Sequence, residues 1–374
     1  MGVTGREGKD SVTQLKNAAI AAPEKILVLP FADGIGDFVN MQPLLSAIAR
    51  RFPGADISVT ASAYANYLIP PSNPVKIVTP SWFNKEPGPL AQTLRHFIPQ
   101  SVLARLVGPI IRREMGSDID LVINTIWLWE KNMDFPHYWT PQTPPRPGAV
   151  HTLDCLANAL EEELGIVIPQ EERYPYLEVL PEAHQWVEDY IQEHNLKKGS
   201  IVALIPESNM LIKKWPVAGW AYLNDKLQER GYQPLFFGPE KSEQLEAIAQ
   251  RARRPVHRVS TTLDKVAALL EQSSLAIGVD TGLLHIAASV GTHWIGIFGP
   301  TNPEVTGPYD RRIGRGLVAP FPRGESCRTC WKSFKYEDDK CHTLELGACT
   351  DFMDRRTVLQ AALDMLPMPL PFQT

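Results

Sequence analysis

Short apolar runs followed by segments of helical spacing recur along this chain in two series, and this alternation limits the folds open to it. In the first series the run 25–30 leads into a glycine-containing turn, and Leu44, Leu45 and Ile48 follow at helical spacing. Further runs rich in β-branched residues are expected as strands at 56–60, 75–79 and 119–125. The first half of the chain therefore alternates strand and helix.

The alternation restarts after an amphipathic helix expected over about residues 181–195. The run 200–205 is expected as the first strand of this second series. Further helices are expected at 217–230 and 242–253, and further strands at 234–237, 275–279 and 294–298. Alternating strands and helices with short connections predict parallel sheets covered by helices on both faces.

The length of 374 residues exceeds a typical single domain and predicts an α/β protein with two doubly wound, Rossmann-like domains. We expect the division to be a flexible segment 1–24, a first domain 25–196, a second domain 197–353, and a C-terminal helix and tail 354–374. Such sheets place ligand sites at the carboxyl ends of their strands. Two facing domains would enclose a central cleft there.

Composition excludes several classes of partner and location. The net charge of −5 argues against binding nucleic acid, which needs clustered Lys and Arg. Residues 1–24 lack the apolar core of a signal peptide, and no stretch is apolar enough to span a bilayer. We therefore expect a cytoplasmic protein.

The turn after the first expected strand carries Gly34, Gly36 and Asp37. Glycines let the backbone approach a ligand, and a carboxylate at a helix start could act across the cleft. Asp37 could equally cap the helix, and both interpretations stand. The spacing does not match the dinucleotide fingerprint, which argues against a nicotinamide cofactor.

Two loops of the second series carry charged candidates. Lys213, in Lys213-Lys-Trp-Pro216, precedes a helix start and could hold a pyrophosphate, although a surface lysine is the simpler interpretation. Glu240, in Gly238-Pro-Glu240, could accept hydrogen bonds from ribose hydroxyls or be a turn residue.

A third loop carries the most specific pattern, Asp280-Thr281-Gly282 followed by His285 one helical turn later. The helix start would offer free N–H groups and a favourable dipole to a phosphate, with the Thr281 hydroxyl beside them. His285 alone could be a core histidine, but the combined spacing favours a phosphate cradle.

Taken in order, these motifs resemble glycosyltransferase family 9, the heptosyltransferase family. Each motif is weak by itself, whereas the ordered set, which spans about residues 25–366, is specific. The set consists of Gly36-Asp37, Lys213-x-Trp215-Pro216, Gly238-Pro-Glu240, Asp280-Thr-Gly-x-x-His285-x-Ala-Ala288, Phe298-Gly-Pro-Thr301 and Gly307-Pro-Tyr309.

The resemblance implies a GT-B fold and an inverting, metal-independent transfer of heptose from ADP-heptose to the lipopolysaccharide core. It implies that Asp37 is the general base and that Lys213 neutralises the leaving diphosphate. The implied donor-binding residues are Gly36, Glu240, Asp280, Thr281, Gly282 and His285. A sugar-nucleotide epimerase of similar architecture and a non-catalytic sugar-nucleotide binding protein are the competing hypotheses.

Four of the five cysteines lie close together, as Cys327, Cys330, Cys341 and Cys349. In a reducing compartment this spacing could bind a structural zinc or iron ion, while free thiols or a redox pair are the alternative. No cofactor is expected to be required for catalysis.

Two further signals have competing interpretations. The basic, amphipathic stretch 95–113 could lie on a membrane as a peripheral contact or pack on the first domain. Asp118-Ile-Asp120 resembles a metal-binding DxD motif, but it leads directly into an expected strand, so we interpret it as a strand-start feature.

Overall fold

The protein is described by a computed structural model, and its residues form two compact units, each with its own sheet. The first unit comprises Met1–Pro145 and Thr152–Arg173, and the second comprises Arg146–His151 and Tyr174–Thr374. The residues that the structure describes are 22–30, 34–69, 71–80, 109–125, 137–139, 150–320 and 349–367.

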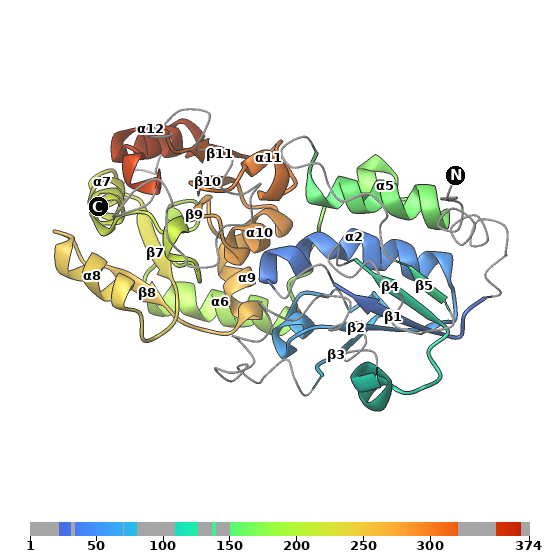
Figure 1. The fold of residues 1–374 in the computed structure, drawn as a ribbon. Coiled ribbons are helices and arrows are strands. Elements are labelled where there is room, and N and C mark those ends of the chain that lie inside the picture. Colours follow the sequence, from blue (N-terminus) through green and yellow to red (C-terminus); the bar gives the residue numbers. More distant parts are fainter. Residues whose placement is uncertain are drawn as a thin grey trace, which may run out of the picture. The chain divides into compact units, whose positions relative to one another are not determined.

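The sheet of the first unit has five parallel strands in the order β3-β2-β1-β4-β5. Helices α2 (Ile35–Arg51) and α5 (Thr152–Leu164) pack side by side in this unit (Figure 1). The strands are β1 (Lys25–Leu29), β2 (Asp56–Thr60), β3 (Lys76–Val78), β4 (Leu121–Asn124) and β5 (His137–Trp139).

The sheet of the second unit has six parallel strands in the order β11-β10-β9-β6-β7-β8. The expected parallel pairing of both sheets is thus confirmed. The strands are β6 (Ile201–Ile205), β7 (Gln233–Phe237), β8 (His257–Val259), β9 (Leu275–Val279), β10 (Trp294–Phe298) and β11 (Gly314–Val318).

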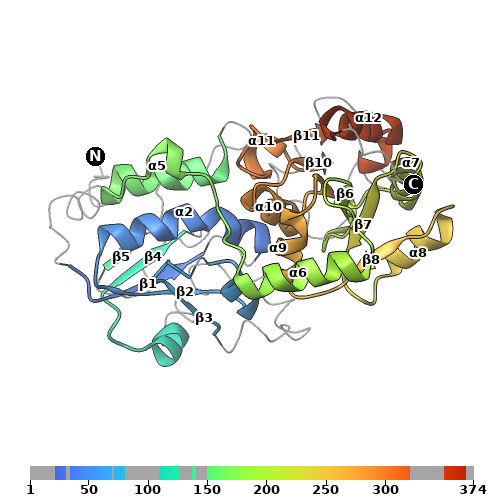
Figure 2. The same ribbon diagram turned by 180° about the vertical axis from the view of Figure 1, so that it is seen from behind.

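Helices cover both faces of this second sheet (Figure 1, Figure 2). Every residue of β6, β9 and β10 is buried, as expected for central strands between two helical layers. One layer contains α7 (Val217–Gln228), α8 (Glu243–Arg251) and α12 (Arg355–Met365), and the other contains α6 (Pro181–Glu193), α9 (Leu263–Glu271) and α10 (Gly282–Ser289). The short helix α11 (Pro303–Thr306) follows β10.

Helix α6 belongs to the second unit, whereas the expected boundary after residue 196 assigned it to the first domain. It packs on α9, where His184 Nδ1 lies 3.4 Å from Glu271 Oε2. Tyr190 Oη also lies 2.7 Å from His257 Nε2. Helix α12 likewise packs on α7 and contributes to the core of the same unit, so the second unit extends through the expected C-terminal helix.

The Asp118-Ile-Asp120 segment is a strand-start feature, as expected from the sequence. Asp120 Oδ2 accepts hydrogen bonds from the backbone N–H groups of Glu24 at 2.8 Å and Lys25 at 2.9 Å. Asp118 forms an ion pair with the Lys25 side chain. Both carboxylates therefore fasten the start of β1 beside that of β4.

The described end of the basic stretch packs inside the first unit. Residues 109–115 are helical, and the buried side chain of Ile111 belongs to a core cluster with Leu27, Leu29, Ile119 and Val122. Residues 95–108 lie outside the described part of the chain. Among the described helices, none is both long and apolar enough to cross a membrane.

Candidate functional site

Three neighbouring strands of the second sheet end at one edge, and the loops that follow them meet at Asp280. Strand β9 lies between β10 and β6 in the sheet order. Asp280 directly follows β9, Lys213 ends a short 3-10 helix after β6, and Thr301 follows β10. Parallel strands bring their carboxyl ends to the same edge, which explains why loops distant in sequence converge.

One oxygen of the Asp280 carboxylate, Oδ2, contacts both Lys213 and Thr301. Lys213 Nζ lies 2.8 Å from Asp280 Oδ2, and Thr301 Oγ1 donates a hydrogen bond to the same atom at 2.7 Å. The Asp280 side chain is 7% exposed and the Lys213 side chain 19%. An ammonium group has three donor hydrogens, so Lys213 can contact Asp280 and still donate to an anionic ligand.

These contacts determine the protonation state of the Asp280 carboxyl group. Burial alone would raise the pKa of its carboxyl group, but the Lys213 ammonium and the hydrogen bonds from Lys213 and Thr301 outweigh burial. Together they hold the pKa below its ordinary value. Asp280 is therefore a carboxylate at neutral pH and fixes the Lys213 ammonium by charge.

His285 lies one turn into α10 and is 6% exposed. Burial lowers the pKa of its imidazole to about 4; Asp280 opposes this shift, whereas His151, Lys213 and Arg311 add to it. The ring is therefore neutral at pH 7. Its Nδ1 atom is buried without a hydrogen-bond partner in the described part of the chain, and a ligand hydroxyl would supply one.

The amino end of α10 offers an anion site beside this ion pair. Thr281 is the N-cap residue, and its side chain makes no capping hydrogen bond. Thr281 and Gly282 are both partly exposed. Because the first N–H groups of a helix have no acceptor within the helix, they and the Thr281 hydroxyl can bind phosphate oxygens. The predicted contacts of Thr281 and Gly282 with a ligand stay predictions.

Lys214, next to Lys213, has a different carboxylate partner. Lys214 Nζ lies 2.9 Å from Glu207 Oε2, and the Ser242 hydroxyl donates to the other oxygen of Glu207. Glu207 follows β6 and Ser242 is the N-cap residue of α8, so this cluster ties two loops of the sheet edge together. The sequence placed Glu207 in the loop before Lys213 but did not predict its pairing with Lys214.

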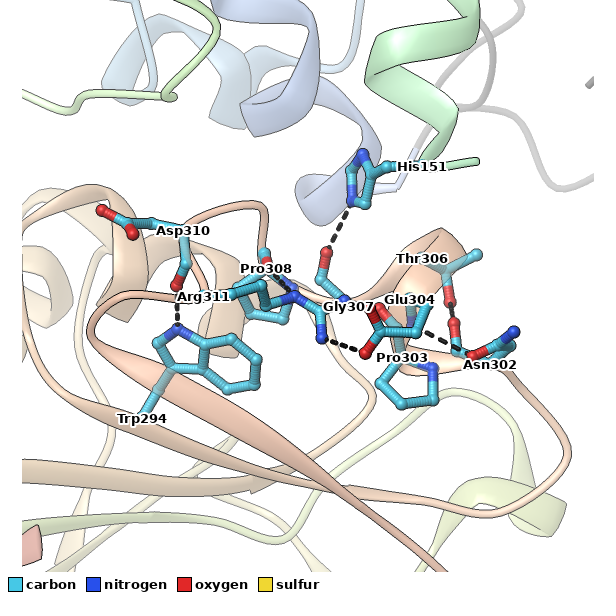
Figure 3. A network of polar contacts seen from close by, with 10 residues as sticks. All are labelled: His151, Trp294, Asn302, Pro303, Glu304, Thr306, Gly307, Pro308, Asp310 and Arg311. Atoms are coloured by element: carbon cyan, nitrogen blue, oxygen red, sulfur yellow. Dashed lines mark hydrogen bonds and ion pairs between the residues drawn. The ribbon is translucent and has the colours of Figure 1, made fainter. Parts of the chain in front are cut away.

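The loop after β10, which carries Thr301, is held by a polar network around Arg311 (Figure 3). Arg311 Nε donates to the carbonyl of Pro308 at 3.1 Å, and Arg311 Nη1 lies 2.7 Å from Glu304 Oε1. His151 Nε2 donates to a carbonyl of the same loop, that of Gly307, at 2.9 Å. Arg311 and His151 also act on the pKa of the His285 imidazole, so this network borders the site.

Glu240 follows β7 at the same edge of the sheet and is exposed. Its carboxylate is therefore accessible to a ligand. The role predicted for it, contact with the nucleoside, stays a prediction.

Gly36 and Asp37 lie in the first unit, in the first turn of α2. The N-cap residue of this helix is Gly34, and a Cβ atom there would lie 2.6 Å from Asp37 Oδ2. The carboxylate thus folds back over the helix start, a position that favours negative charge. Local stabilisation of α2 and a catalytic role remain compatible, and the ligand roles of Gly36 and Asp37 stay predictions.

Three residues of the cysteine cluster, Cys327, Cys330 and Cys341, lie outside the described residues. Cys349 is described and is partly buried at the start of a short 3-10 helix. The predicted zinc or iron site therefore stays a prediction.

Comparison with known proteins connects this geometry to one family. The sequence model of glycosyltransferase family 9 (heptosyltransferase) matches residues 142–327. Lipopolysaccharide heptosyltransferase 1 of Pseudomonas aeruginosa is 33% identical over 122 residues, which cover 32% of this chain and 33% of that protein. Lipopolysaccharide heptosyltransferase 3 of Escherichia coli is 34% identical over 118 residues, which cover 30% of this chain and 35% of that protein. These alignments therefore span about a third of each curated relative.

Solved structures resemble a much larger part of the chain. A family 9 glycosyltransferase from Veillonella parvula has a TM-score of 0.66 at 20% identity, covering 92% of this chain and 97% of that one. The E. coli ADP-heptose lipopolysaccharide heptosyltransferase II has a TM-score of 0.62 at 18% identity, covering 91% and 98%. An iron-containing dodecameric glycosyltransferase, TibC of enterotoxigenic E. coli, has a TM-score of 0.54 at 13% identity, covering 92% and 76%.

The chain belongs to glycosyltransferase family 9. Its fold is the GT-B fold, with two Rossmann-like units of parallel sheet. The matched residues 142–327 include Lys213, Asp280 and His285, whereas Asp37 lies outside them.

Proposed function

We propose that this protein is an inverting glycosyltransferase that moves heptose from ADP-heptose to a hydroxyl group of the lipopolysaccharide core. The observation that carries the proposal is the convergence of Lys213 and Thr301 on Asp280, beside the open amino end of α10. The names of the relatives, which are lipopolysaccharide heptosyltransferases, supply the substrate class.

The donor diphosphate would bind between Lys213 and the start of α10. Two kinds of group favour an anion there: the partly exposed ammonium of Lys213, and the backbone N–H groups and hydroxyl at Thr281 and Gly282. As the bond to the sugar breaks, negative charge grows on the leaving diphosphate. Preorganised donors of this kind stabilise that charge without rearrangement.

His285 and Glu240 would complete the donor site. The neutral His285 ring has a buried Nδ1 atom with no partner among the described residues, and this atom would bond to a donor hydroxyl. The exposed Glu240 carboxylate would accept hydrogen bonds from the ribose.

The acceptor would be activated by Asp37. In an inverting transfer a general base removes the proton of the acceptor hydroxyl as its oxygen attacks the anomeric carbon, and the diphosphate leaves from the opposite side. The position of Asp37 at a helix start favours the carboxylate form that this role requires.

The proposal is tested by incubating the full chain with ADP-heptose and a heptose-deficient lipopolysaccharide core, with UDP-glucose and GDP-mannose as control donors. We expect a heptosylated core whose new linkage has the opposite anomeric configuration to the donor. Conversion of the donor without any acceptor would indicate an epimerase instead. Donor binding without transfer to a broad acceptor panel would indicate a binding protein.

We further propose a structural zinc or iron ion at Cys327, Cys330, Cys341 and Cys349. The support is the cysteine spacing and the iron named for one structural neighbour, TibC. Metal analysis of the purified chain should give about one zinc or iron per chain, reduced in a Cys327→Ser/Cys330→Ser variant. If the purified wild-type chain contains neither zinc nor iron, the metal site is wrong and the cysteines are free thiols or a redox pair.

A peripheral membrane contact through residues 95–113 is the remaining proposal, supported by the basic and apolar residues of this stretch. The burial of Ile111 limits any such surface to other side chains of the stretch. Co-sedimentation with vesicles containing anionic lipid should exceed that with neutral vesicles. Equal, negligible binding to both would rule the contact out.

A further inference from the structure

A third segment ties together the two loops that bring Lys213 and Thr301 to Asp280. This segment, 349–353, contains a 3-10 helix, Cys349–Phe352, and precedes α12. Its second residue, Thr350, is completely buried although it is polar. Its contacts reach both loops.

On one side the segment is hydrogen-bonded to the loop after β6. Thr350 Oγ1 donates to the carbonyl oxygen of Lys214 at 2.7 Å. The indole Nε1 of Trp215 donates to the carbonyl oxygen of Met353 at 3.0 Å. These two bonds hold the backbone that directly follows Lys213, and therefore fix the point from which the Lys213 side chain reaches Asp280.

On the other side the segment packs against the loop after β10. A Cβ atom at Gly299 would lie 2.7 Å from Thr350 Cγ2 and 2.9 Å from Cys349 Sγ. Contacts this close leave room for glycine only, so the backbone of Gly299 lies directly on the segment. Gly299 is two residues before Thr301, whose hydroxyl bonds to Asp280.

We propose that Thr350 is a positioning residue for the donor site, which sets the spacing between the Lys213 loop and the Thr301 loop. Its hydroxyl holds the first loop and its methyl group supports the second. This inference rests on the proposed function only for the identity of the ligand, because the contacts among the loops do not depend on it.

Alternatively, Thr350 could be a buried threonine of the core with no influence on the site. Thr292 provides the matched control for this alternative. It is 4% exposed, and its Oγ1 donates to the carbonyl of Leu270 at 2.6 Å, a bond of the same kind. Thr292 follows α10 and precedes β10, and so lies toward the opposite edge of the sheet from Asp280.

The experiment compares the full chain with Thr350→Val, Thr350→Ser and Thr292→Val. Valine keeps the shape of threonine but removes the hydroxyl, whereas serine keeps the hydroxyl. Hydrogen exchange of the unliganded proteins is measured over residues 207–216 and 299–302. We expect Thr350→Val to exchange faster in both stretches, Thr350→Ser to remain close to wild type in the first, and Thr292→Val to match wild type in both.

ADP titration by calorimetry supplies the second measurement. Thr350→Val should weaken ADP binding about tenfold, Thr350→Ser by much less, and Thr292→Val not at all, even if both valine variants lose similar thermal stability. If the two valine variants behave alike in exchange, the positioning role is wrong. If wild type binds no ADP, the proposed function fails, while hydrogen exchange still decides the role of Thr350.

Discussion

Lys213 and Asp280 form a largely buried ion pair at the end of β6 and β9, and Thr301 adds a hydrogen bond to the same carboxylate oxygen. Removing the cation from a buried ion pair destabilises the fold more than removing it from an exposed pair. The carboxylate left behind has little water to solvate its charge. The pair therefore links the stability of the second unit to the chemistry of its site.

Replacement of Lys213 by methionine tests this link. Lys213→Met should lower the free energy of unfolding by about 2–3 kcal/mol, because among the described residues Asp280 would keep only the hydrogen bond from Thr301. It should also weaken ADP binding by at least about tenfold, which calorimetry can measure. The control is Lys198→Met, which breaks an exposed pair with Glu188 and should change neither quantity appreciably. Wild-type ADP affinity in Lys213→Met would remove Lys213 from the donor site.

The buried imidazole of His285 makes stability depend on pH. The pKa of its ring falls from 6.5 to about 4 on folding, so between these values the unfolded chain binds a proton that the folded chain does not. Its contribution to stability is therefore complete above about pH 6.5 and is lost as the pH falls toward 4. The lowered pKa of Asp280 takes effect as the pH approaches its ordinary value of 3.8, at the acidic end of this window.

His285→Asn should therefore flatten the decline of unfolding free energy between about pH 6.5 and pH 4, by roughly 3 kcal/mol at the acidic end. Urea unfolding across this range measures the difference between the two proteins. His257, whose pKa is also lowered, is present in both proteins and cancels in the comparison. Parallel pH profiles would show that His285 is not held neutral.

The sequence was sufficient to bring most of these residues to one sheet edge. Asp280 directly follows an apolar strand and Lys213 follows another within a short loop, and strand ends are where such sheets bind ligands. The bond from Thr301 and the pairing of Glu207 with Lys214 could not be predicted. Both depend on the spatial order β10-β9-β6-β7, which differs from the order along the chain.

At the scale of elements, the strands that could be predicted from the sequence are the fully buried ones. The fully buried strands β6, β9 and β10 lie close to their expected bounds, because an uninterrupted apolar run marks a strand covered on both faces. Strands β8 and β11 each carry an exposed Arg, and β11 also carries two partly exposed glycines, so neither sequence gave such a signal. Their pairing comes from the neighbouring strand rather than from their own residues.

Helix α7 contains a glycine whose small size positions Trp215. A Cβ atom at Gly219 would lie 2.5 Å from Trp215 Cζ2, and the Trp215 side chain is 2% exposed. Alanine in place of glycine normally stabilises a helix by about 1 kcal/mol. Here we expect Gly219→Ala to lower the free energy of unfolding by about 1–3 kcal/mol, because the indole ring must move.

A double-mutant cycle with Trp215→Phe checks the cause. Phenylalanine lacks the second ring of tryptophan, which supplies the three atoms nearest to a Cβ at Gly219. Gly219→Ala should therefore destabilise the Trp215→Phe protein much less than the wild type, as measured by urea unfolding. Equal losses in both backgrounds would attribute the effect to something other than this contact.

At the scale of the whole molecule, two sheets were predictable and the boundary between the units was not. Helix α6 is amphipathic. An amphipathic pattern indicates that one face of a helix is buried, but it does not indicate against which sheet. Because α6 packs on α9, it belongs to the second unit. Of the residues predicted to bind the donor, all except Gly36 then belong to the second unit, whereas Gly36 and Asp37 belong to the first.

Under the proposed function, most donor contacts come from the second unit and acceptor activation comes from the first, and Asp37→Asn tests this most directly. Asparagine keeps the size of the side chain beside Gly34 but cannot accept the acceptor proton. ADP affinity should stay within about twofold of wild type, while kcat with ADP-heptose and acceptor should fall about 10²–10⁴-fold. A variant that retains wild-type turnover, or that loses donor binding together with turnover, would contradict the account.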